Sequence, residues 1–379
     1  MSEPESDSEG ETITLHELLE RSARAALELQ REDGSFPPGR NGVYDEPETP
    51  VRTTSHWLTT LSKVYEITGD EVFADAANDA ADYLLSDEAR PHGYTFHSRN
   101  AKGKDKCDGL VGQVAPIRGL AWAGSVLERP ELLETAKDVV LLHPFDEGLG
   151  LWERVEIDGS VLSFDRTLNH QILFAGAASH LAGEYKEIKN TVTRFTAQLE
   201  SNMCLHDDGI IKHYIRPPLG RTVRTVLCEP RYWRLLANDV LSRFYSYSAK
   251  RKQKEIGYHP VNLLGLAQLK SNLVAVGSWS DVGADIPIEG ISATDTISLV
   301  AEYDGQYGAM TPGIDIALAL QILCDADSER VQQWLKRDFQ KKFDMKSGFL
   351  SKGAVDPISQ ASGISYIVDL QNMKVPLLV

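Results

Sequence analysis

Two aspartates, Asp108 and Asp165, occupy matching places in the sequence, each just before or at the start of a stretch with helical periodicity. Two carboxylates that flank a sugar can perform acid/base chemistry at a glycosidic carbon when one is protonated and the other is ionised. Aspartate is also a preferred N-cap residue, and both positions are places where a helix needs a cap. The sequence therefore leaves two interpretations open, an acid/base pair and a pair of helix caps.

Three further side chains could take part in proton transfer near these carboxylates. His170 follows Asp165 on the same predicted helix, and the pKa of a histidine is easily moved into the working range of pH. Tyr258 and His259 open another predicted helix, and tyrosine with histidine is a pair used in proton abstraction. Each of the three could instead be a packing residue. The candidate catalytic residues are therefore Asp108, Asp165, His170, Tyr258 and His259.

Basic, aromatic and amide side chains near the same helix starts could bind a substrate. Arg52 and His56 are four residues apart and share a helix face, and Trp57 could stack on a sugar ring. Arginine presents a bidentate fork to carboxylate or phosphate, so these residues suggest an anionic ligand. The alternative is that each arginine pairs with a local acidic residue. The candidate substrate-binding residues are Arg52, His56, Trp57, Trp152, Arg154, Asn169, Tyr214 and Arg216.

Sequence motifs for several other chemistries are absent. The chain has no Gly-x-Ser-x-Gly elbow, no HExxH, no Walker loop and no GxGxxG at a strand-to-helix turn. His92 and His97 are loosely spaced in a predicted loop, which makes them a poor metal-binding pair. We therefore expect no metal and no cofactor.

Helical periodicity recurs along most of the chain, and strand patterns are few and short. At residues 14–31, leucines and alanines fall at three- and four-residue steps, which predicts a helix with one buried face. Further helices are predicted near 51–67, 70–86, 109–127, 130–142, 166–183, 186–204, 230–250, 259–271, 291–303, 312–324, 328–342 and 361–370.

A glycine turn recurs in register with these helices. Glycine can close a helix in the left-handed conformation, and an apolar residue after it can pack back onto the helix end. Such turns occur six times, at 33–36, 92–96, 148–152, 208–210, 305–307 and 347–349. This repetition predicts six helical hairpins.

The links between helices alternate in length. Long links at 32–50, 87–108, 143–165, 205–229 and 343–360 join the two helices of a hairpin, and short links join one hairpin to the next. If the hairpins close into a ring, the long loops emerge on one face, where function concentrates. The sequence thus predicts an all-α protein, an (α/α)6 toroid. The extra helix near 230–250 and the long link at 272–290 break the alternation.

With this architecture over residues 12–370, the chain resembles the six-hairpin glycosidase superfamily. The phrases that carry the resemblance are CDGL at 107–110, FDRTLNHQ at 164–171 and IGYH at 256–259. The superfamily includes unsaturated glucuronyl hydrolases, sugar 2-epimerases and the helical domain of glucuronyl C5-epimerases. The glycoside-hydrolase-like proteins of archaeal surface-glycan gene clusters are the most similar group. Unsaturated glucuronyl hydrolases use an aspartate pair about one hairpin apart, so the resemblance implies that role for Asp108 and Asp165.

Composition and charge restrict the class of protein further. The chain has 379 residues, 42% of them apolar, with 39 Lys and Arg against 55 Asp and Glu and a net charge of −16. This balance argues against a protein that binds nucleic acid or an anionic membrane, since either partner requires a basic face. The acidity is typical of solvation in a salty cytoplasm, which points to a haloarchaeal source. The four cysteines are far apart and are expected to be reduced thiols.

The first residues are acidic and have no apolar run, unlike a signal peptide or an anchor. We expect a disordered acidic tail at 1–12, a single toroid domain at 13–379 and a cytoplasmic location. No segment approaches 18 consecutive apolar residues, so no stable membrane insertion is expected. The oligomeric state stays open.

The leading hypothesis is a carbohydrate-active enzyme that processes a glycan or lipid-linked sugar in protein N-glycosylation, by epimerisation or isomerisation or by hydrolysis of a uronic-acid-type sugar. One alternative is a non-catalytic glycan-binding or scaffold protein, in which both aspartates are caps or ion-paired. Another is a catabolic unsaturated glucuronyl hydrolase. Because fold does not imply function, the choice among these reactions rests on the resemblance.

Overall fold

The computed structural model describes residues 12–237, 249–283, 285–303 and 311–376. The main helices are α1 (Leu15–Leu27), α2 (Val51–Thr68), α3 (Glu71–Leu85), α4 (Val111–Val126), α5 (Pro130–Leu142), α6 (Leu168–Ser179), α7 (Lys186–Asn202), α8 (Leu219–Cys228), α10 (Ala249–Ala275), α13 (Thr294–Glu302), α14 (Pro312–Leu323), α15 (Ser328–Lys342) and α16 (Pro357–Ser362), which continues into the 3-10 helix η3 (Gly363–Asp369).

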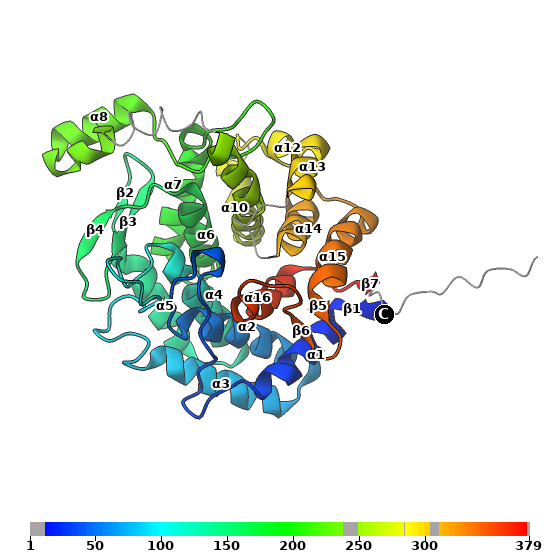
Figure 1. The fold of residues 1–379 in the computed structure, drawn as a ribbon. Coiled ribbons are helices and arrows are strands. Elements are labelled where there is room, and N and C mark those ends of the chain that lie inside the picture. The colour runs from blue at the N-terminus through cyan, green and yellow to red at the C-terminus, as the bar shows by residue number, and fades with distance from the viewer. Residues whose placement is uncertain (1–11, 238–248, 284, 304–310, 377–379) are drawn as a thin grey trace, which may run out of the picture.

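Six of these elements form a closed inner ring. Going round it, α2 packs on α4, α4 on α6, α6 on α10, α10 on α14, α14 on η3, and η3 on α2 (Figure 1). An outer layer surrounds them, in which α1, α3, α5, α7, α13 and α15 each pack against an inner helix. The predicted (α/α)6 toroid is therefore confirmed, with the last inner position occupied by a short α-helix and a 3-10 helix.

Burial distinguishes the two layers. Inner helices such as α4 and α6 bury nearly every residue, whereas α1 buries only the face that carries Leu15, Leu18 and Leu19. An amphipathic outer helix and a uniformly apolar inner helix are the patterns expected for surface and interior positions. Only the outer helices have a one-sided apolar pattern; the inner helices are apolar on all sides.

The described strands are short and lie in small sheets and ribbons around the ring. Strand β1 (Thr12–Thr14) pairs antiparallel with β7 (Lys374–Pro376), joining the two ends of the described chain. Strands β2 (Phe145–Asp146), β3 (Leu151–Val155) and β4 (Val161–Phe164) form a sheet in one long loop. Strands β5 (Phe343–Asp344) and β6 (Phe349–Leu350) form a ribbon in another. Thr12, assigned above to the tail, thus belongs to β1, while residues 1–11 lie outside the described part.

The glycine turns adopt the expected conformation but do not cap helices directly. Gly34, Gly93, Gly150, Gly209 and Gly348 all have positive φ, between 66° and 82°. Gly34, for example, lies several residues beyond the end of α1 at Leu27, and a Cβ there would be 2.1 Å from a backbone oxygen. Of the apolar residues after the turns, Phe36, Phe96, Leu151 and Ile210 are buried, Phe349 is half-buried and Tyr94 is exposed. The turn at 305–307 lies outside the described residues.

A polar side chain in each of three inner helices fastens a loop to the ring, near the helix start in α4 and α6 but well inside α10. Gln113 of α4 bonds the backbone of Phe96, and Gln171 of α6 bonds the backbone of Trp152 in the same way. In α10 the corresponding contact is made by His259, whose Nδ1 accepts from the N–H of Ile211 at 3.2 Å. These contacts hold the loops against the inner helices.

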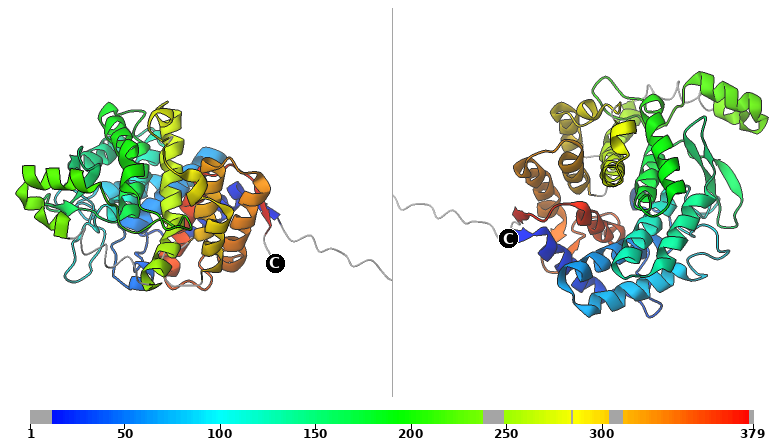
Figure 2. Two further views of the ribbon diagram at one scale, coloured as in Figure 1. Left: turned by 90° about the horizontal axis from the view of Figure 1, so that it is seen from above. Right: turned by 180° about the vertical axis from the view of Figure 1, so that it is seen from behind.

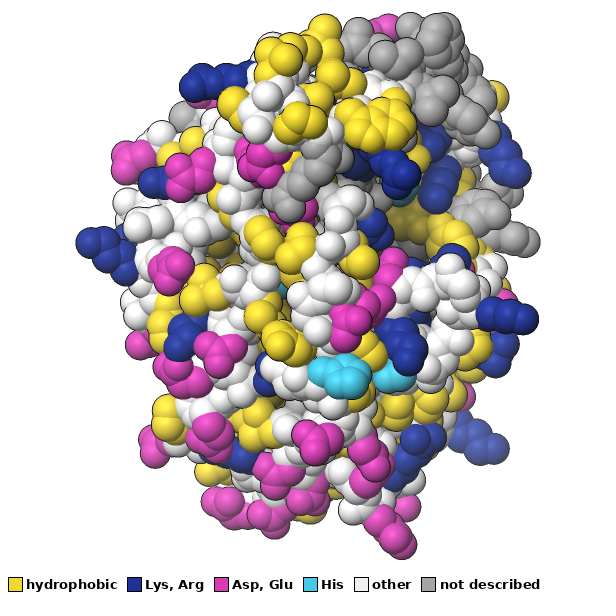
Figure 3. Space-filling view, turned by 90° about the vertical axis from the view of Figure 1, so that its left-hand side faces the viewer, with side chains coloured by type: hydrophobic (Ala, Val, Ile, Leu, Met, Phe, Trp, Pro, Cys, Tyr) yellow, Lys and Arg dark blue, Asp and Glu magenta, His cyan; other side chains and the backbone are white. Residues whose placement is uncertain are grey.

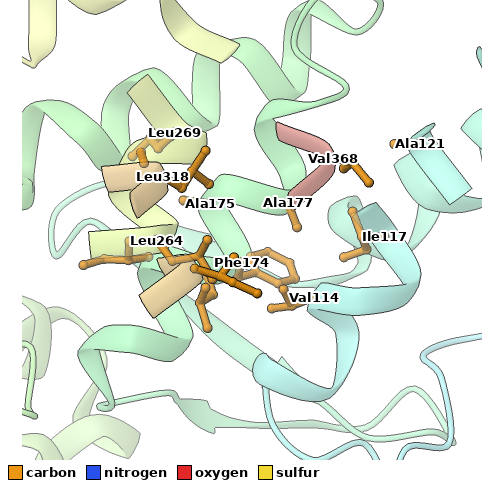
Figure 4. Packing of buried hydrophobic residues seen from close by; sticks show 14 of the residues in the cluster. Val114, Ile117, Ala121, Phe174, Ala175, Ala177, Leu264, Leu269, Leu318 and Val368 are labelled. Carbon is orange, nitrogen blue, oxygen red and sulfur yellow. The ribbon is translucent and has the colours of Figure 1, made fainter. Parts of the chain in front are cut away.

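The centre of the ring is filled below the helix starts. Arg118, two turns into α4, donates to Asp369 of η3 at 3.0 Å, and Gln268 of α10 donates to the same carboxylate at 2.9 Å. Apolar side chains from five inner elements pack nearby (Figure 4). The labelled residues include Val114 and Ile117 of α4, Phe174 and Ala177 of α6, Leu264 of α10, Leu318 of α14 and Val368 of η3.

Three segments differ from the sequence expectations. Helix α8 occupies a region predicted to be a loop, and it projects from the ring (Figures 1 and 2). The helix predicted near 230–250 is described at η2 (Pro230–Tyr232), at a helical stretch over 233–237 and at the start of α10, which begins earlier than predicted; residues 238–248 lie outside the described part. The long link at 272–290 contains α11 (Trp279–Val282) and leads into α12 (Ile288–Ile291).

Candidate functional site

The candidate site lies where the starts of α2, α4 and α6 meet. Arg52 in the first turn of α2 reaches Asp108 in the loop before α4, and the N–H of Leu110 at the start of α4 donates to Asp165 before α6. The long loops thus converge on one face of the ring. The positive ends of three helix dipoles converge there as well, which favours negative charge.

Asp108 is held by two arginines. Its Oδ2 accepts from Arg52 at 2.9 Å and its Oδ1 accepts from Arg99 at 2.5 Å. Within the described ranges, neither oxygen is bonded to an amide of α4, so Asp108 is not a helix cap. Its backbone has φ of +56°, in the left-handed region that costs a non-glycine residue about 1 kcal/mol. Both oxygens of this carboxylate are therefore engaged in ion pairs.

The arginines near the site pair with acidic residues, which is the alternative that the sequence left open. Arg52 also contacts Glu48 at 2.8 Å, and burial raises the pKa of that glutamate. Arg99 also contacts Asp105 at 3.0 Å, and Arg154 contacts the same aspartate at 3.3 Å. Arg52 and Arg154 are therefore neutralised by the protein itself, and the expectation that they bind an anionic ligand loses its basis.

Asp165 has a different set of partners. It accepts from the backbone N–H groups of Thr167 at 3.1 Å and Leu110 at 3.3 Å, so it contributes to capping the neighbouring helix α4. Its Oδ2 also bonds Nδ1 of His170 at 2.9 Å. Burial alone would raise the pKa of Asp165, but the charge and hydrogen bond of His170 and the Thr167 N–H lower it to about 2. Asp165 is therefore ionised at neutral pH.

His170 is the titratable partner in this pair. Burial opposes its protonation, but the carboxylate of Asp165 outweighs that effect and raises the pKa of His170. Its side chain is 27% exposed, so the ring is accessible from the loop face. Since an ionised carboxylate can only accept, Nδ1 carries a proton and Nε2 is the atom that can exchange one with a substrate.

Gly109 lies at the point where the two aspartates approach each other. Its φ is +60°, and a Cβ built there would be 2.9 Å from Oδ2 of Asp165 and 3.3 Å from Cδ of Arg154. Asp108 is the preceding residue, so the two carboxylates belong to one cluster. The sequence prediction that successive hairpins bring Asp108 and Asp165 together agrees with this geometry.

Tyr258 lies in the same cluster and forms a hydroxyl pair. Its hydroxyl is 2.8 Å from that of Tyr44, and burial together with this hydrogen bond raises the pKa of Tyr258. The ring of His213 packs on Tyr258 at 5.6 Å between centroids. Burial and the charges of Lys254 and Arg251 lower the pKa of His213 to about 3. Tyr258 is therefore a neutral phenol beside a neutral imidazole.

The segment 213–216 forms the wall of the site beside α6. The N–H of Leu168 donates to the carbonyl of His213 at 2.8 Å, and Tyr214 pairs with Thr167 in an isolated β-bridge. The guanidinium of Arg251 lies 4.3 Å from the centroid of the Tyr214 ring. Arg216 continues this wall, half-buried, with its N–H bonded to the carbonyl of Asn202.

Three of the expected site residues are instead part of the core. Trp57 is buried against Phe36 and Phe349, so its faces cannot stack on a sugar. Trp152 is buried among the aromatic rings of Phe145, Phe174 and Phe195. His259 is fully buried, with Nδ1 accepting from Ile211 and Nε2 2.7 Å from the carbonyl of Ile291. It fastens a loop, as Gln113 and Gln171 do, and cannot reach a substrate.

His56 and Asn169 lie deeper than the aspartates. His56 is buried and bonds Ser365 at 2.8 Å; burial and the charges of Arg118 and Arg52 lower its pKa to about 3. Asn169 is buried, and its Oδ1 has no hydrogen-bond partner among the described residues, as is also true of Oδ1 of Asn262. An unpartnered buried oxygen can accept from a sugar hydroxyl or a water.

Several residues of the site were absent from the sequence predictions. Glu48, Arg99 and Tyr44 hold Arg52, Asp108 and Tyr258 in place. Glu48 lies four residues before Arg52, a spacing that predicts an ion pair across a helix start. Arg99 and Tyr44 come from long loops, where no periodicity indicates a contact. Within the described residues there is no group of three or more His, Cys, Asp or Glu side chains that could hold a metal ion.

Comparison with known proteins places this architecture. No family model matches the chain. Among solved structures, a sugar epimerase from a ruminal bacterium has a TM-score of 0.62 at 10% identity, covering 93% of this chain and 98% of its own. D-mannose isomerase has a TM-score of 0.58 at 13% identity, covering 93% and 96%. An inactive variant of the α-1,6-mannanase GH76A of Salegentibacter sp. HEL1_6, in complex with α-1,6-mannotriose, has a TM-score of 0.52 at 10% identity, covering 94% and 98%.

At these identities the solved structures share the fold alone, which is the six-hairpin glycosidase-like fold that the sequence resembles. A relative in sequence is much more similar. Archaeal glycosylation protein Q of Haloferax volcanii is 35% identical over 371 residues, which cover 96% of this chain and 99% of that protein. This chain therefore belongs to the family of archaeal glycosylation protein Q.

Proposed function

We propose that this protein is a sugar epimerase or isomerase that processes a glycan or lipid-linked sugar during protein glycosylation. The observation that carries the proposal is the Asp165–His170 pair, in which a buried carboxylate raises the pKa of a histidine that is open to the loop face. The name of the Haloferax relative supports a role in glycosylation. The solved structures of an epimerase and an isomerase support the fold's suitability for such chemistry.

The pair is suited to proton transfer at a carbon atom. Asp165 orients His170 through Nδ1, so that Nε2 can take a proton from a carbon next to a carbonyl or carboxyl group. Tyr258 stays protonated because its pKa is raised, so it can return a proton to that carbon. Removal and return of a proton on opposite faces inverts the stereocentre without any change in mass.

The electrostatics favour this reaction over hydrolysis. A glycosidase needs one carboxyl group that stays protonated to assist the leaving group. Asp165 is ionised because its pKa is about 2, and both oxygens of Asp108 are bonded to arginine, one to Arg52 and the other to Arg99. Neither aspartate of the predicted pair can therefore act as that acid without losing its partners.

The expected substrate carries a carboxylate or a phosphate. The starts of three inner helices meet at the site, and their dipoles favour an anion. Arg251 and Lys254 lie against the rings of Tyr214 and Tyr258, but Arg251 pairs with Glu255 at 3.2 Å, so the helix dipoles carry this preference. A uronic acid would satisfy this preference, and its carboxylate would also acidify the neighbouring C–H bond.

The test takes lipid-linked glycans from cells that lack the gene, grown in ordinary water, and incubates them in heavy water with purified wild-type, His170→Gln or Asp165→Asn protein. Epimerisation is expected to incorporate one deuterium at an inverted carbon with wild-type protein and none with either variant. His92→Gln, on an exposed loop, is the matched control and should behave as wild type.

Two outcomes would contradict the proposal. A glycan that becomes shorter only when wild-type protein is present would establish hydrolysis instead. If the mass, stereochemistry and deuterium content of the glycans are the same in every case, the protein is a non-catalytic glycan-binding protein. The ion pairs of Asp108 favour this alternative.

A further inference from the structure

Helix α8 exposes apolar side chains to solvent on the side that faces away from the ring. Leu219, Val223 and Leu227 are spaced four residues apart and share one face, and all three are exposed, Leu227 to 77%. Trp233, just after the helix, is 57% exposed. These four residues are called here the α8 face. In Figure 3, which looks at this side of the molecule, hydrophobic side chains gather at the top, whereas acidic ones gather on the lower part.

The side of α8 that faces the ring is mostly polar, with Thr222 buried and Val226 half-buried against the core. Arg221 donates to Gln198 and Ser201 of α7, at 2.9 and 3.3 Å. Arg221, Arg224, Thr225 and Cys228 line a cavity of about 650 Å³ together with residues of the β2–β3 turn. A surface helix ordinarily turns its apolar side inward, so this reversed arrangement leaves an apolar surface for something outside the chain.

The segment that carries α8 has a charge opposite to that of the whole chain, and Asp146 and Glu147 of the β2–β3 turn border it at the cavity. Between residues 216 and 234 there are five arginines and one glutamate, a net charge of +4 in a chain of −16. Arg224 is exposed beside Leu227 and has no ion-pair partner among the described residues. The guanidinium of Arg234 lies 5.7 Å from the centroid of the exposed Trp233 ring. Leucine and tryptophan bordered by arginine are the side chains that an interfacial helix presents to a bilayer.

We propose that the α8 face docks onto the surface of an anionic lipid bilayer, with α8 lying in the plane of the interface. The charge complementarity selects an anionic bilayer, since each arginine near such a surface adds attraction. A stable protein partner would instead need roughly 20–30 residues on each side, far more than this ridge supplies. The net charge of the chain argues against membrane binding only when the charge is spread evenly, which it is not. None of the described helices is long and apolar enough to cross a membrane, so the contact is peripheral.

The α8 face is attached to the candidate site at both ends. Residues 213–216, directly before α8, form the wall beside α6, and Tyr232, directly after it, donates to Glu153 at 2.9 Å and packs on Phe164 next to Asp165. Docking would therefore bring the mouth of the ring close to the bilayer. Such a placement would give the site access to a lipid-linked sugar, and this part of the argument rests on the proposed function. The docking itself does not depend on it.

Sedimentation of the full-length protein with sugar-free vesicles tests the docking separately from any reaction. Vesicles of phosphatidylcholine with phosphatidylglycerol are expected to bind wild-type protein, and pure phosphatidylcholine vesicles much less. Replacing both Val223 and Leu227 by Asp should lower binding at least about tenfold, since two exposed apolar contacts are lost. The matched control replaces Val274 and Val355, 56% and 75% exposed elsewhere, by Asp and should leave binding unchanged.

A charge variant keeps the test valid if the aspartates unfold α8. Arg224→Gln should lower binding to the anionic vesicles about fivefold, whereas Arg31→Gln, an exposed arginine near α1, should not. Equal binding to both vesicle types, or equal effects of the α8 and control variants, would overturn the proposal. So would a wild-type dimer in light scattering that the Val223 and Leu227 replacements dissociate, because the face would then be an interface between copies.

Discussion

Asp108 and Asp165 stand before successive inner helices, yet their surroundings give them different properties. Asp108 lies in a left-handed turn, with one oxygen on Arg52 and the other on Arg99. Asp165 has no such guanidinium bond among the described residues; it accepts two backbone N–H groups and the imidazole of His170. Asp165 is hydrogen-bonded to His170 and raises the pKa of that histidine more strongly than the charge of Asp108 does.

The difference shows that position in a repeat does not determine chemistry. The two hairpins place a carboxylate at the same point, and the residues supplied by neighbouring loops decide what it does. Two permanent cations make Asp108 a fixed structural charge. A histidine makes Asp165 the positioning residue of a proton carrier. The following predictions compare the two aspartates directly.

The largest expected difference is in turnover. Asp165→Asn removes the charge that orients His170 and should slow conversion of the sugar about a thousandfold or more, as loss of the carboxylate does in comparable histidine pairs. Asp108→Asn should slow it only about tenfold through displacement of Arg52. The rate of solvent deuterium incorporation measures both. Equal losses for the two variants would mean that the aspartates act as one catalytic unit.

The ion pairs of Asp108 should also contribute to stability. Asp108→Asn leaves Arg52 and Arg99 with one fewer buried partner each, which should lower the free energy of unfolding by about 2–3 kcal/mol. Arg40→Gln, which removes an exposed pair with Asp45, is the control and should change it by less than about 0.5 kcal/mol. Urea denaturation of both variants gives these values. No loss in Asp108→Asn would show that the two ion pairs contribute nothing.

Gly109→Ala tests the contact between the two aspartate regions. A Cβ at this position meets Oδ2 of Asp165, whereas Gly103 has a similar positive φ and nothing within 4 Å. Gly103→Ala should therefore cost only the backbone strain, about 1 kcal/mol, and Gly109→Ala about 1 kcal/mol more. Thermal unfolding compares the two. The same shift in both would place the Asp165 carboxylate farther away than the structure has it.

The smallest effect is on the titration of His170, followed by NMR. Asp165 and Asp108 both raise the pKa of His170, Asp165 more strongly, so the pKa should fall in Asp108→Asn and fall further in Asp165→Asn. If neutral His170 is the base, the acid limb of the activity profile should move to lower pH in the same order. The opposite order would assign His170 to Asp108.

The same pair makes stability depend on pH. Because the pKa of His170 is raised above its ordinary 6.5, the contribution of the pair is complete below that pH and is lost as the pH rises through the raised pKa. Because the pKa of Asp165 is lowered from 3.8 to about 2, the contribution is also lost as the pH falls through that range. The wild-type protein should therefore gain most over His170→Gln between about pH 4 and 6.5.

The toroid was predictable because helical stretches repeat along the chain and the long links alternate with short ones. Asp108, Asp165 and His170 were predictable as a cluster because helix starts in successive hairpins must meet. Trp57, Trp152 and His259 were assigned wrongly, because a sequence gives the side of a helix that is apolar but not whether a loop covers it. Phe36, Phe349 and the Ile211 backbone provide that cover.

Helix α8 was not predicted from the sequence, for a related reason. Its apolar residues have helical spacing, but they lie in a long link rich in arginine and proline that is typical of a loop. The partners of Asp108 were also hidden, since Arg99 comes from an irregular part of the same long loop. Contacts made by irregular segments depend on the closed ring, and no local pattern records them.

The Arg118–Asp369 pair and the apolar residues packed around it close the ring below the site. A ring closed at one end has a single entrance, so a glycan can be engaged only by an end or a branch and cannot be threaded through. Substrate and product must pass through the same mouth in turn. Product inhibition should therefore be competitive, and the rate of turnover should depend on how quickly the product leaves through this entrance.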